Sequence, residues 1–162
     1  MIVCMVAGMV PRRAKRQSGR MKTITPELMK KRQSLVDEHI AAEDAKDVAR
    51  TLKTFHTPHY HVRPLGTETK GGPAVAELLG MLFSAFPDFS FRPSHSYHAA
   101  DALIVEGTML ATHRGPWAGV PASGNRIDVP TCCIYHFDDD KLVSESVYFD
   151  HATLLAQIGV KG

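Results

Sequence analysis

Cysteine is scarce in this sequence, and the familiar cofactor motifs are missing. The 162 residues include three cysteines, Cys4, Cys132 and Cys133, too few for a disulfide framework. No CxxC pair, GxGxxG turn, P-loop or HExxH helix occurs, so no motif for zinc, dinucleotides or nucleotide phosphates is present. We therefore predict a protein that needs no cofactor and no metal and works in the reducing cytoplasm.

An apolar run long enough to cross a membrane is also missing. The run from Met1 to Val10 is about half the length that a bilayer requires, and basic residues follow it, the reverse of a secretory signal. We expect no membrane contact. Because Met21 opens an ordinary domain start, residues 1–20 are predicted to be a disordered tail or an upstream-start extension, and residues 21–162 the domain.

Acidic residues do not occur in the first twenty positions, which hold five of the 19 lysines and arginines. The other 14 basic residues stand against 17 acidic ones, so the rest of the chain has a net charge of −3, although the total is +2. A nucleic-acid-binding domain needs a basic face. The charge distribution therefore argues against a nucleic-acid partner.

Hydrophobic periodicity predicts helices. Hydrophobic residues make up 44% of the chain, enough for one core with a pocket inside it. Thr25 is a suitable residue to cap the first helix. Within that helix, His39 and Glu43 are spaced by four and fall on the same stripe as apolar Val36 and Ile40. The predicted helices span residues 25–47, 47–56, 72–86 and 151–159.

After residue 87 the hydrophobic period changes to two, which is typical of strands. Residues 66–72, GTETKGG, are interpreted as a turn. Helices that lead into such a meander predict an α+β domain, a cone-shaped roll in which a curved antiparallel sheet wraps around helices and leaves a hollow for a small molecule. The predicted strands span residues 59–65, 89–98, 102–113, 125–137 and 141–149.

Three stretches resemble one family. FPDFSF (86–91), THRGPWAGVPASGNRI (112–127) and ESVYFDHATLLAQIG (145–159) are similar to motifs of the SnoaL-like polyketide cyclases, within the nuclear transport factor 2-like superfamily. The resemblance implies the cone-shaped fold and a homodimer formed through the outer face of the sheet. Ketosteroid isomerases and limonene epoxide hydrolases have a similar architecture but other chemistry, so the fold alone does not choose the reaction.

Asp150, between a strand and a helix, has two interpretations. Aspartate is a good N-cap, and the resemblance implies that the aspartate at this place is the catalytic acid/base. Strand alternation puts Tyr148 on the same face as Asp150, where its phenol would bind substrate, and puts Glu145 on the opposite, more apolar face. If Asp150 is catalytic, the strand face that carries Asp150 and Tyr148 is expected to line the hollow. The position of Glu145 on the other, more apolar face is then unexplained.

Other side chains complete the predicted site. His113 matches a family motif and is the second catalytic candidate, to orient a substrate oxygen or move a proton; the alternative is a hydrogen bond to its loop. Trp117, the single tryptophan, is either a wall for a ring substrate or part of the core. His39 is a substrate-binding candidate whose pairing with Glu43 also suits an exposed helix face. Phe83 and Met109 are expected to line the cone.

Three histidines, His56, His59 and His61, lie close together in HTPHYH. His59 and His61 share a strand face, but His56 precedes a proline turn, so the spacing does not match that of a catalytic zinc site. We expect these histidines to be exposed to solvent and to bind no metal.

The hypothesis that follows is a cofactor-free isomerase or lyase. Asp150 would remove a proton next to a carbonyl of a small hydrophobic substrate, and ring closure or isomerisation of the enolate would follow. An epoxide hydrolase-like enzyme is the first alternative and needs a second buried acid near Asp150, from Glu43, Glu145 or Asp128. A non-catalytic binding module is the second, favoured if Asp150 only caps a helix and Phe83, Met109 and Trp117 fill the cone.

Overall fold

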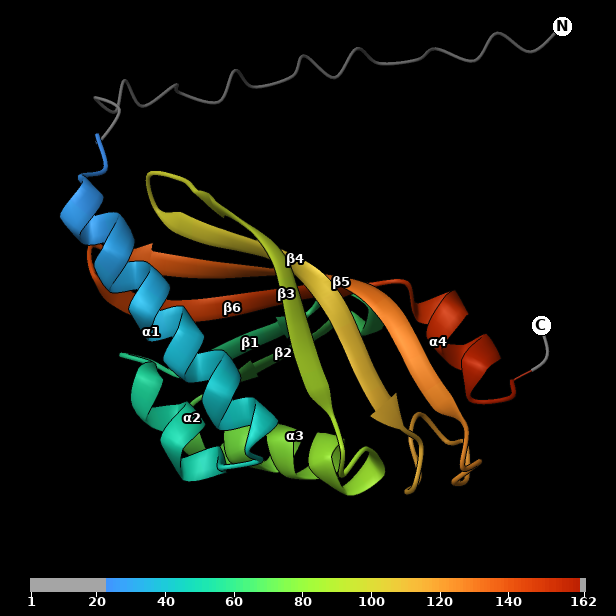
Figure 1. Ribbon diagram of the computed structural model, residues 1–162. Helices are drawn as coiled ribbons and strands as arrows, with labels where there is room; N and C mark the ends of the chain where they lie inside the picture. The colour runs from blue at the N-terminus through green and yellow to red at the C-terminus, as the bar shows by residue number, and fades with distance from the viewer. Residues whose placement is uncertain (1–22, 161–162) are drawn as a thin grey trace, which may run out of the picture.

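Helices cover one face of an open, curved sheet (Figure 1). The structure is a computed structural model that describes residues 23–160; the prediction for residues 1–20 lies outside this range. Over these residues the chain forms four α-helices and a six-stranded sheet in the order β2-β1-β6-β5-β4-β3. The predicted α+β cone is confirmed.

The first helix, α1 (Pro26–Asp44), contributes two buried polar side chains, His39 and Glu43, to the core. It begins at Thr25, whose hydroxyl accepts a hydrogen bond from the Leu28 amide at 3.2 Å. The helix crosses the concave face of the sheet and buries Val36, His39, Ile40 and Glu43 against it. His39 and Glu43 therefore face the core, and the interpretation as an exposed helix pair is wrong.

Two further helices complete this layer. They are α2 (Val48–Thr54) and α3 (Gly72–Ala85), close to the predicted ranges. The α3 helix buries Val75 and Leu79 completely, and Phe86 follows it into the core. None of the helices in the described part of the chain is long and apolar enough to cross a membrane.

A hairpin at one edge of the sheet differs from the prediction. After β1 (His59–Val62), the short 3-10 helix η1 (Arg63–Leu65) and Gly66, in the left-handed conformation at φ 62°, reverse the chain into β2 (Thr67–Lys70). Most of the predicted turn is thus a strand. In addition, β1 pairs in parallel with β6, so the sheet is mixed and not antiparallel throughout.

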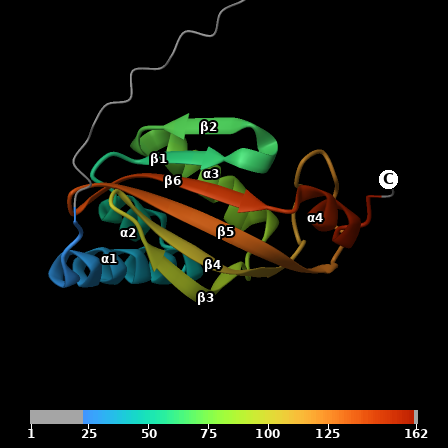
Figure 2. The same cartoon turned by 90° about the horizontal axis from the view of Figure 1, so that it is seen from above.

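The antiparallel meander follows the prediction closely. The strands β3 (Ser90–His98), β4 (Ala102–Thr112), β5 (Arg126–Asp138) and β6 (Lys141–Phe149) pair in sequence, with shifts of register in β3 and β5. Such bulges bend strands. Seen from above in Figure 2, the last helix, α4 (His151–Gln157), lies beyond the end of β6. Leu154 in α4 and Ile158, which directly follows the helix, are buried, so this segment adds apolar cover to that end.

Candidate active site

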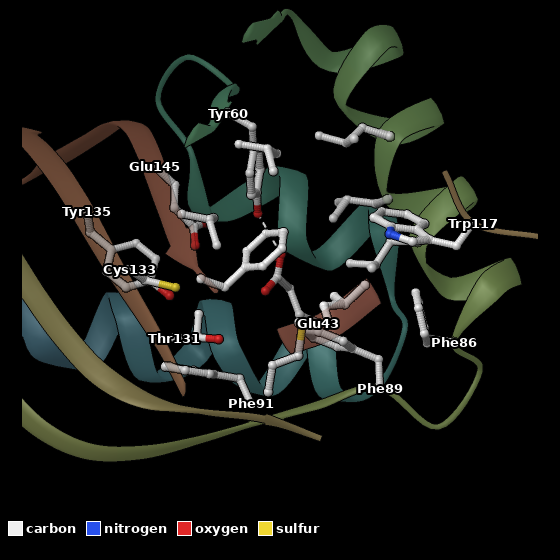
Figure 3. A pocket seen from close by; sticks show the side chains of 18 residues that line it. Glu43, Tyr60, Phe86, Phe89, Phe91, Trp117, Thr131, Cys133, Tyr135 and Glu145 are labelled. Carbon is white, nitrogen blue, oxygen red and sulfur yellow. Dashed lines mark hydrogen bonds between the residues drawn. The ribbon is translucent and has the colours of Figure 1, made fainter. Parts of the chain in front are cut away.

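An apolar chamber of about 90 Å³ lies between the helices and the concave face of the sheet. Figure 3 shows aromatic side chains of Phe86 and Trp117 at one side and the oxygens of Tyr60 and Glu145 at the other. A largely apolar cavity with a few convergent polar groups is the usual form of a small-molecule site. The lining includes Leu79, Phe86, Phe89, Phe91, Met109, Trp117 and Val147 and, among polar residues, Glu43, Tyr60, Thr131, Cys133, Tyr135 and Glu145.

Three elements bring the polar cluster together. His39 and Glu43 lie one turn apart on α1, and Tyr60 and Glu145 come from the neighbouring strands β1 and β6. The parallel register puts Tyr60 beside Glu145, so both side chains lie on the concave face. His39, Glu43, Tyr60 and Glu145 are all buried. We refer to these four residues as the His39 cluster.

The hydrogen bonds define the protonation of His39. The Thr54 hydroxyl donates to the Thr51 carbonyl at 2.6 Å, so it accepts the bond from His39 Nδ1 at 2.7 Å. The Tyr60 hydroxyl donates to Glu43 Oε1 at 2.6 Å and thus accepts from His39 Nε2 at 2.9 Å. Both ring nitrogens are therefore donors. His39 is an imidazolium.

The electrostatics agree with this assignment. Burial disfavours the imidazolium, but the charge of Glu43 and the hydrogen bond to Glu145 outweigh burial and raise the pKa of His39 to about 10. Glu145 Oε2 lies 3.1 Å from His39 Nε2. Burial raises the pKa of Glu145, and the negative charge of Glu43 raises it further. The hydrogen bond to His39 lowers this pKa, but the net shift is upward. Burial also raises the pKa of Tyr60 well above its usual range and keeps it a neutral phenol.

The net charge of the His39 cluster favours the binding of one more proton. Two carboxylates and one imidazolium sum to one negative charge in an apolar chamber, an unfavourable state that protonation of a carboxylate relieves. Since Glu145 lines the chamber and its pKa is raised, it is the group suited to accept that proton. The His39 cluster has the chemistry of a general acid/base.

Comparison with known proteins defines the family. A model of the SnoaL-like polyketide cyclases matches residues 33–158. The chain belongs to the SnoaL-like polyketide cyclase family. None of the curated proteins matches this member of the family.

Solved structures share the fold of this SnoaL-like chain. A SnoaL-like protein from Jannaschia sp. CCS1 has a TM-score of 0.74 at 17% identity, over 86% of this chain and 99% of the other. AclR, a candidate hydroxylase from Streptomyces galilaeus, has a TM-score of 0.69 and a sequence identity of 24%, and the match covers 81% of this chain and 82% of the other. The third structure is a protein from Catenulispora acidiphila with a ketosteroid isomerase-like fold, in complex with trimethylamine. Its TM-score is 0.69 at a sequence identity of 16%, and the match covers 85% of this chain and 96% of the other.

Asp150 lies outside the chamber of this SnoaL-like domain. Its Oδ1 accepts hydrogen bonds from the amides of Ala152 and Thr153 at 3.0 and 3.1 Å, and its Oδ2 accepts one from the Thr153 hydroxyl at 2.6 Å. The bonds from Thr153 and then Ala152 lower the pKa of this exposed carboxylate. The expectation that Asp150 projects into the hollow is wrong, because its oxygens cap α4.

The alternation predicted for β6 is correct, but the face that points into the chamber is the one that carries Glu145, not the one that carries Asp150. Glu145, Val147 and Phe149 line the chamber, whereas Tyr148 is 42% exposed on the other side of the sheet. A shallow surface depression there includes both Tyr148 and Asp150. The two residues do share a wall, as the alternation predicts, but it is the outer wall.

The other candidate residues are dispersed. Trp117 and Met109 line the chamber, and Trp117 packs edge-on against Phe86 at a centroid distance of 5.4 Å. Phe83 packs 6.1 Å from Phe89 and is not in the lining. His113 is buried behind Phe86, where its Nδ1 accepts the Ser123 amide at 3.3 Å and lies 3.0 Å from the Ser123 hydroxyl. His113 thus contacts its loop through Ser123 and not through a carbonyl, while its buried Nε2 has no hydrogen-bond partner among the described residues.

From the sequence, Glu43 and Glu145 were named only as possible second acids beside Asp150, and Tyr60 was not named. Glu145 on the apolar face of β6 was a visible signal, as was Glu43 on the apolar stripe of α1. Tyr60 had none, because the parallel pairing of β1 with β6 brings it to the cluster.

Two groups of side chains in the described residues have donor atoms close enough for one metal ion. His39, Glu43 and Glu145 form the buried group. His59, His61 and Glu68 form the other, on the edge hairpin.

Proposed function

We propose that this SnoaL-like protein is an enzyme that moves a proton on a small, largely apolar carbonyl compound, with Glu145 as the base. The observation that carries the proposal is the buried His39 cluster at the polar side of an apolar chamber. A carboxylate with a raised pKa is a better base near neutral pH than an exposed one. Asp150 has no part in this step because its oxygens cap a helix.

The reaction begins at the carbon next to the substrate carbonyl. The Glu145 carboxylate takes a proton from this carbon, and the electron pair of the C–H bond forms the enolate. In an isomerisation, protonated Glu145 returns the proton to another carbon. In a ring closure, the enolate carbon attacks a second carbonyl of the same molecule, and the resulting alkoxide takes the proton from Glu145. No external oxidant or reductant is consumed.

The rest of the cluster positions Glu145. The His39 Nε2–H contacts Glu145 Oε2, and the Thr54 hydroxyl fixes the orientation of the imidazole from its other nitrogen. Glu43, held by the Tyr60 hydroxyl, supplies the negative charge that keeps His39 protonated. A base held in this way contributes about 10²–10⁴ in rate.

Addition of water is the second candidate reaction. Glu43 and Glu145 both line the chamber and contact the same imidazole, at 3.5 and 3.1 Å. Two acids of this kind suit one water, with one group acting as base and the other as acid in the opening of an epoxide. Asp128, the third acid considered from sequence, is exposed. Incorporation of ¹⁸O from labelled water into a diol product distinguishes this reaction from enolate chemistry.

A binding module without catalysis makes a different prediction. Asp150 caps a helix, as this alternative requires, but the cone is not filled: about 90 Å³ remains open, and Phe83 is not part of its wall. A binding protein would take up apolar ketones without exchanging their protons.

The proposed assembly is a homodimer through the outer face of the sheet. Tyr97 on β3 and Tyr148 on β6 expose 50% and 42% of their surface. Light scattering coupled to size exclusion gives the mass, and Tyr148→Asp should shift it toward the monomer. A monomeric wild-type protein would contradict the proposal.

Deuterium exchange tests the proposed chemistry. A panel of small cyclic ketones in D₂O is followed by NMR for loss of the signal of the proton next to the carbonyl. Glu145→Gln should lower the enzymatic rate by at least roughly 10²-fold, and Asp150→Asn serves as the matched carboxylate control with an unchanged rate. Loss of exchange in Asp150→Asn alone would overturn the assignment, and binding without exchange by the wild type would favour the binding module.

A further inference from the structure

The two faces of β1 have different roles. Tyr60 points into the chamber, so alternation turns His59 and His61 to the outer face of the sheet. The register of the β1–β2 hairpin places Glu68 opposite His61 and Lys70 opposite His59. Four polar side chains therefore meet on the outer face of this hairpin.

The distances between these side chains fit a bound cation. Glu68 Oε1 lies 2.9 Å from His59 Nε2 and 3.6 Å from His61 Nε2. Ligand bonds of about 2.0–2.1 Å in a tetrahedral zinc site separate the donor atoms by about 3.3 Å. The two distances lie on either side of this value. All three donor atoms lie within 4.8 Å of one another, close enough to bind the same ion.

The imidazoles are already oriented. Their side chains are 19% and 20% exposed, and the two ring centroids lie 4.2 Å apart. Two histidines and one carboxylate, with a water in the fourth position, form a common zinc ligand set. We propose that His59, His61 and Glu68 form a binding site for a zinc-like divalent cation on the outer face of the β1–β2 hairpin.

Lys70 competes with the ion. Its Nζ lies 2.7 Å from Glu68 Oε1, the oxygen that would bind the metal. The Lys70 side chain is 67% exposed, so it can turn into solvent when a cation arrives. Its charge lowers the affinity of the site. Removing that charge should therefore strengthen metal binding, an effect opposite in direction to the loss of a ligand.

The ion would tie the edge of the sheet together. It would join β1 to β2 on the outer face, while the Tyr60 hydroxyl on the inner face of β1 holds Glu43. From the sequence no metal was predicted here, because His56 precedes a proline turn and the spacing of the three histidines does not match a catalytic zinc site. The third donor becomes apparent only when Thr67–Lys70 is seen to be a strand.

Calorimetric titration of the full chain with zinc chloride, with the cysteines kept reduced, tests the site. His59→Gln and His61→Gln should each weaken binding by at least about tenfold, and Lys70→Gln should tighten it. His95→Gln, an exposed histidine on β3, is the matched control and should bind as the wild type does. Circular dichroism checks that each variant is folded.

The melting temperature gives a second measure. Zinc should raise it in the wild type and in His95→Gln, and a chelator should reverse the rise; in His61→Gln zinc should have little effect. Wild-type affinity in both His59→Gln and His61→Gln, or absence of zinc binding in the wild-type chain, overturns the proposal. Loss of binding in Glu145→Gln together with its retention in His61→Gln would place the ion in the chamber instead.

Discussion

Glu145 and His39 meet through a 3.1 Å contact between Oε2 and Nε2, and both side chains are buried. The imidazole donates through both nitrogens, so the contact joins a cation to a carboxylate inside an apolar chamber. Breaking one partner of a buried pair costs about 3–5 kcal/mol, more than a surface pair contributes. The contact therefore links the stability of the domain to the protonation of its candidate site.

Stability should depend on pH through His39. Its pKa in the folded protein, about 10, lies above the ordinary 6.5, so its contribution is fully present below about pH 6.5 and is lost as the pH rises through 10. Denaturant titrations across this window should show the free energy of unfolding of the wild type falling by several kcal/mol relative to His39→Gln. A constant difference between the two proteins over the window would contradict the assignment.

Tyr60→Phe should destabilise the domain and preserve its shape. The hydroxyl donates to Glu43 and accepts from His39, and its loss removes the hydrogen-bond donor of the buried Glu43 Oε1, while His39 keeps its contact with Glu145. We expect the free energy of unfolding to fall by about 1–3 kcal/mol. Tyr97→Phe removes a half-exposed hydroxyl and should change it by less than about 0.5 kcal/mol. Equal effects of the two substitutions would argue against a structural role for the cluster.

Ligand entry should alter the fluorescence of Trp117. This residue is the single tryptophan of the chain and lines the chamber, so its emission reports on the site. An apolar ketone should change the emission and saturate with concentration. Val147→Phe fills part of the chamber and should weaken this binding, whereas Leu110→Phe, outside the lining, should leave it unchanged. Identical binding curves for the two variants would place the ligand elsewhere.

Asp150 should behave as a helix cap. Asp150→Ala removes the acceptor of two amide hydrogen bonds and should lower the melting temperature by roughly 2–4 °C. Asp150→Asn keeps an accepting oxygen and should melt close to the wild type. Because the pKa of Asp150 is lowered, its contribution is present above pH 3.8 and is lost in acid. An unchanged melting temperature in Asp150→Ala would show that the cap is not needed.

The helices and the antiparallel meander could be predicted from the sequence because they depend on local patterns. Period, caps and turn residues place the helices and the meander within a few residues, since each signal is contained in its own element. The edge hairpin was missed because TETK lacks apolar residues and forms a strand only by pairing with β1. Nothing local indicates that β1 also pairs in parallel with β6.

The site was harder to predict because it depends on which face of one strand is buried. The alternation of β6 separates Glu145 from Asp150 correctly, and the apolar side chains on the Glu145 face indicated the inner side. The family resemblance favoured Asp150 against this pattern. A lone acid on an apolar strand face, together with His39 and Glu43 on an apolar helix stripe, was the stronger physical signal.

The proposed chemistry depends on a proton held in the His39 cluster. ¹⁵N NMR of the His39 imidazole, assigned by comparison with His39→Gln, measures this directly. At about pH 8, above the ordinary histidine pKa of about 6.5, we predict that both ring nitrogens of His39 are protonated and that Glu145→Gln lowers the pH at which the ring titrates. A neutral His39 at that pH, with an ordinary titration near 6.5, would contradict the assignment of His39 as an imidazolium and of Glu145 as its partner.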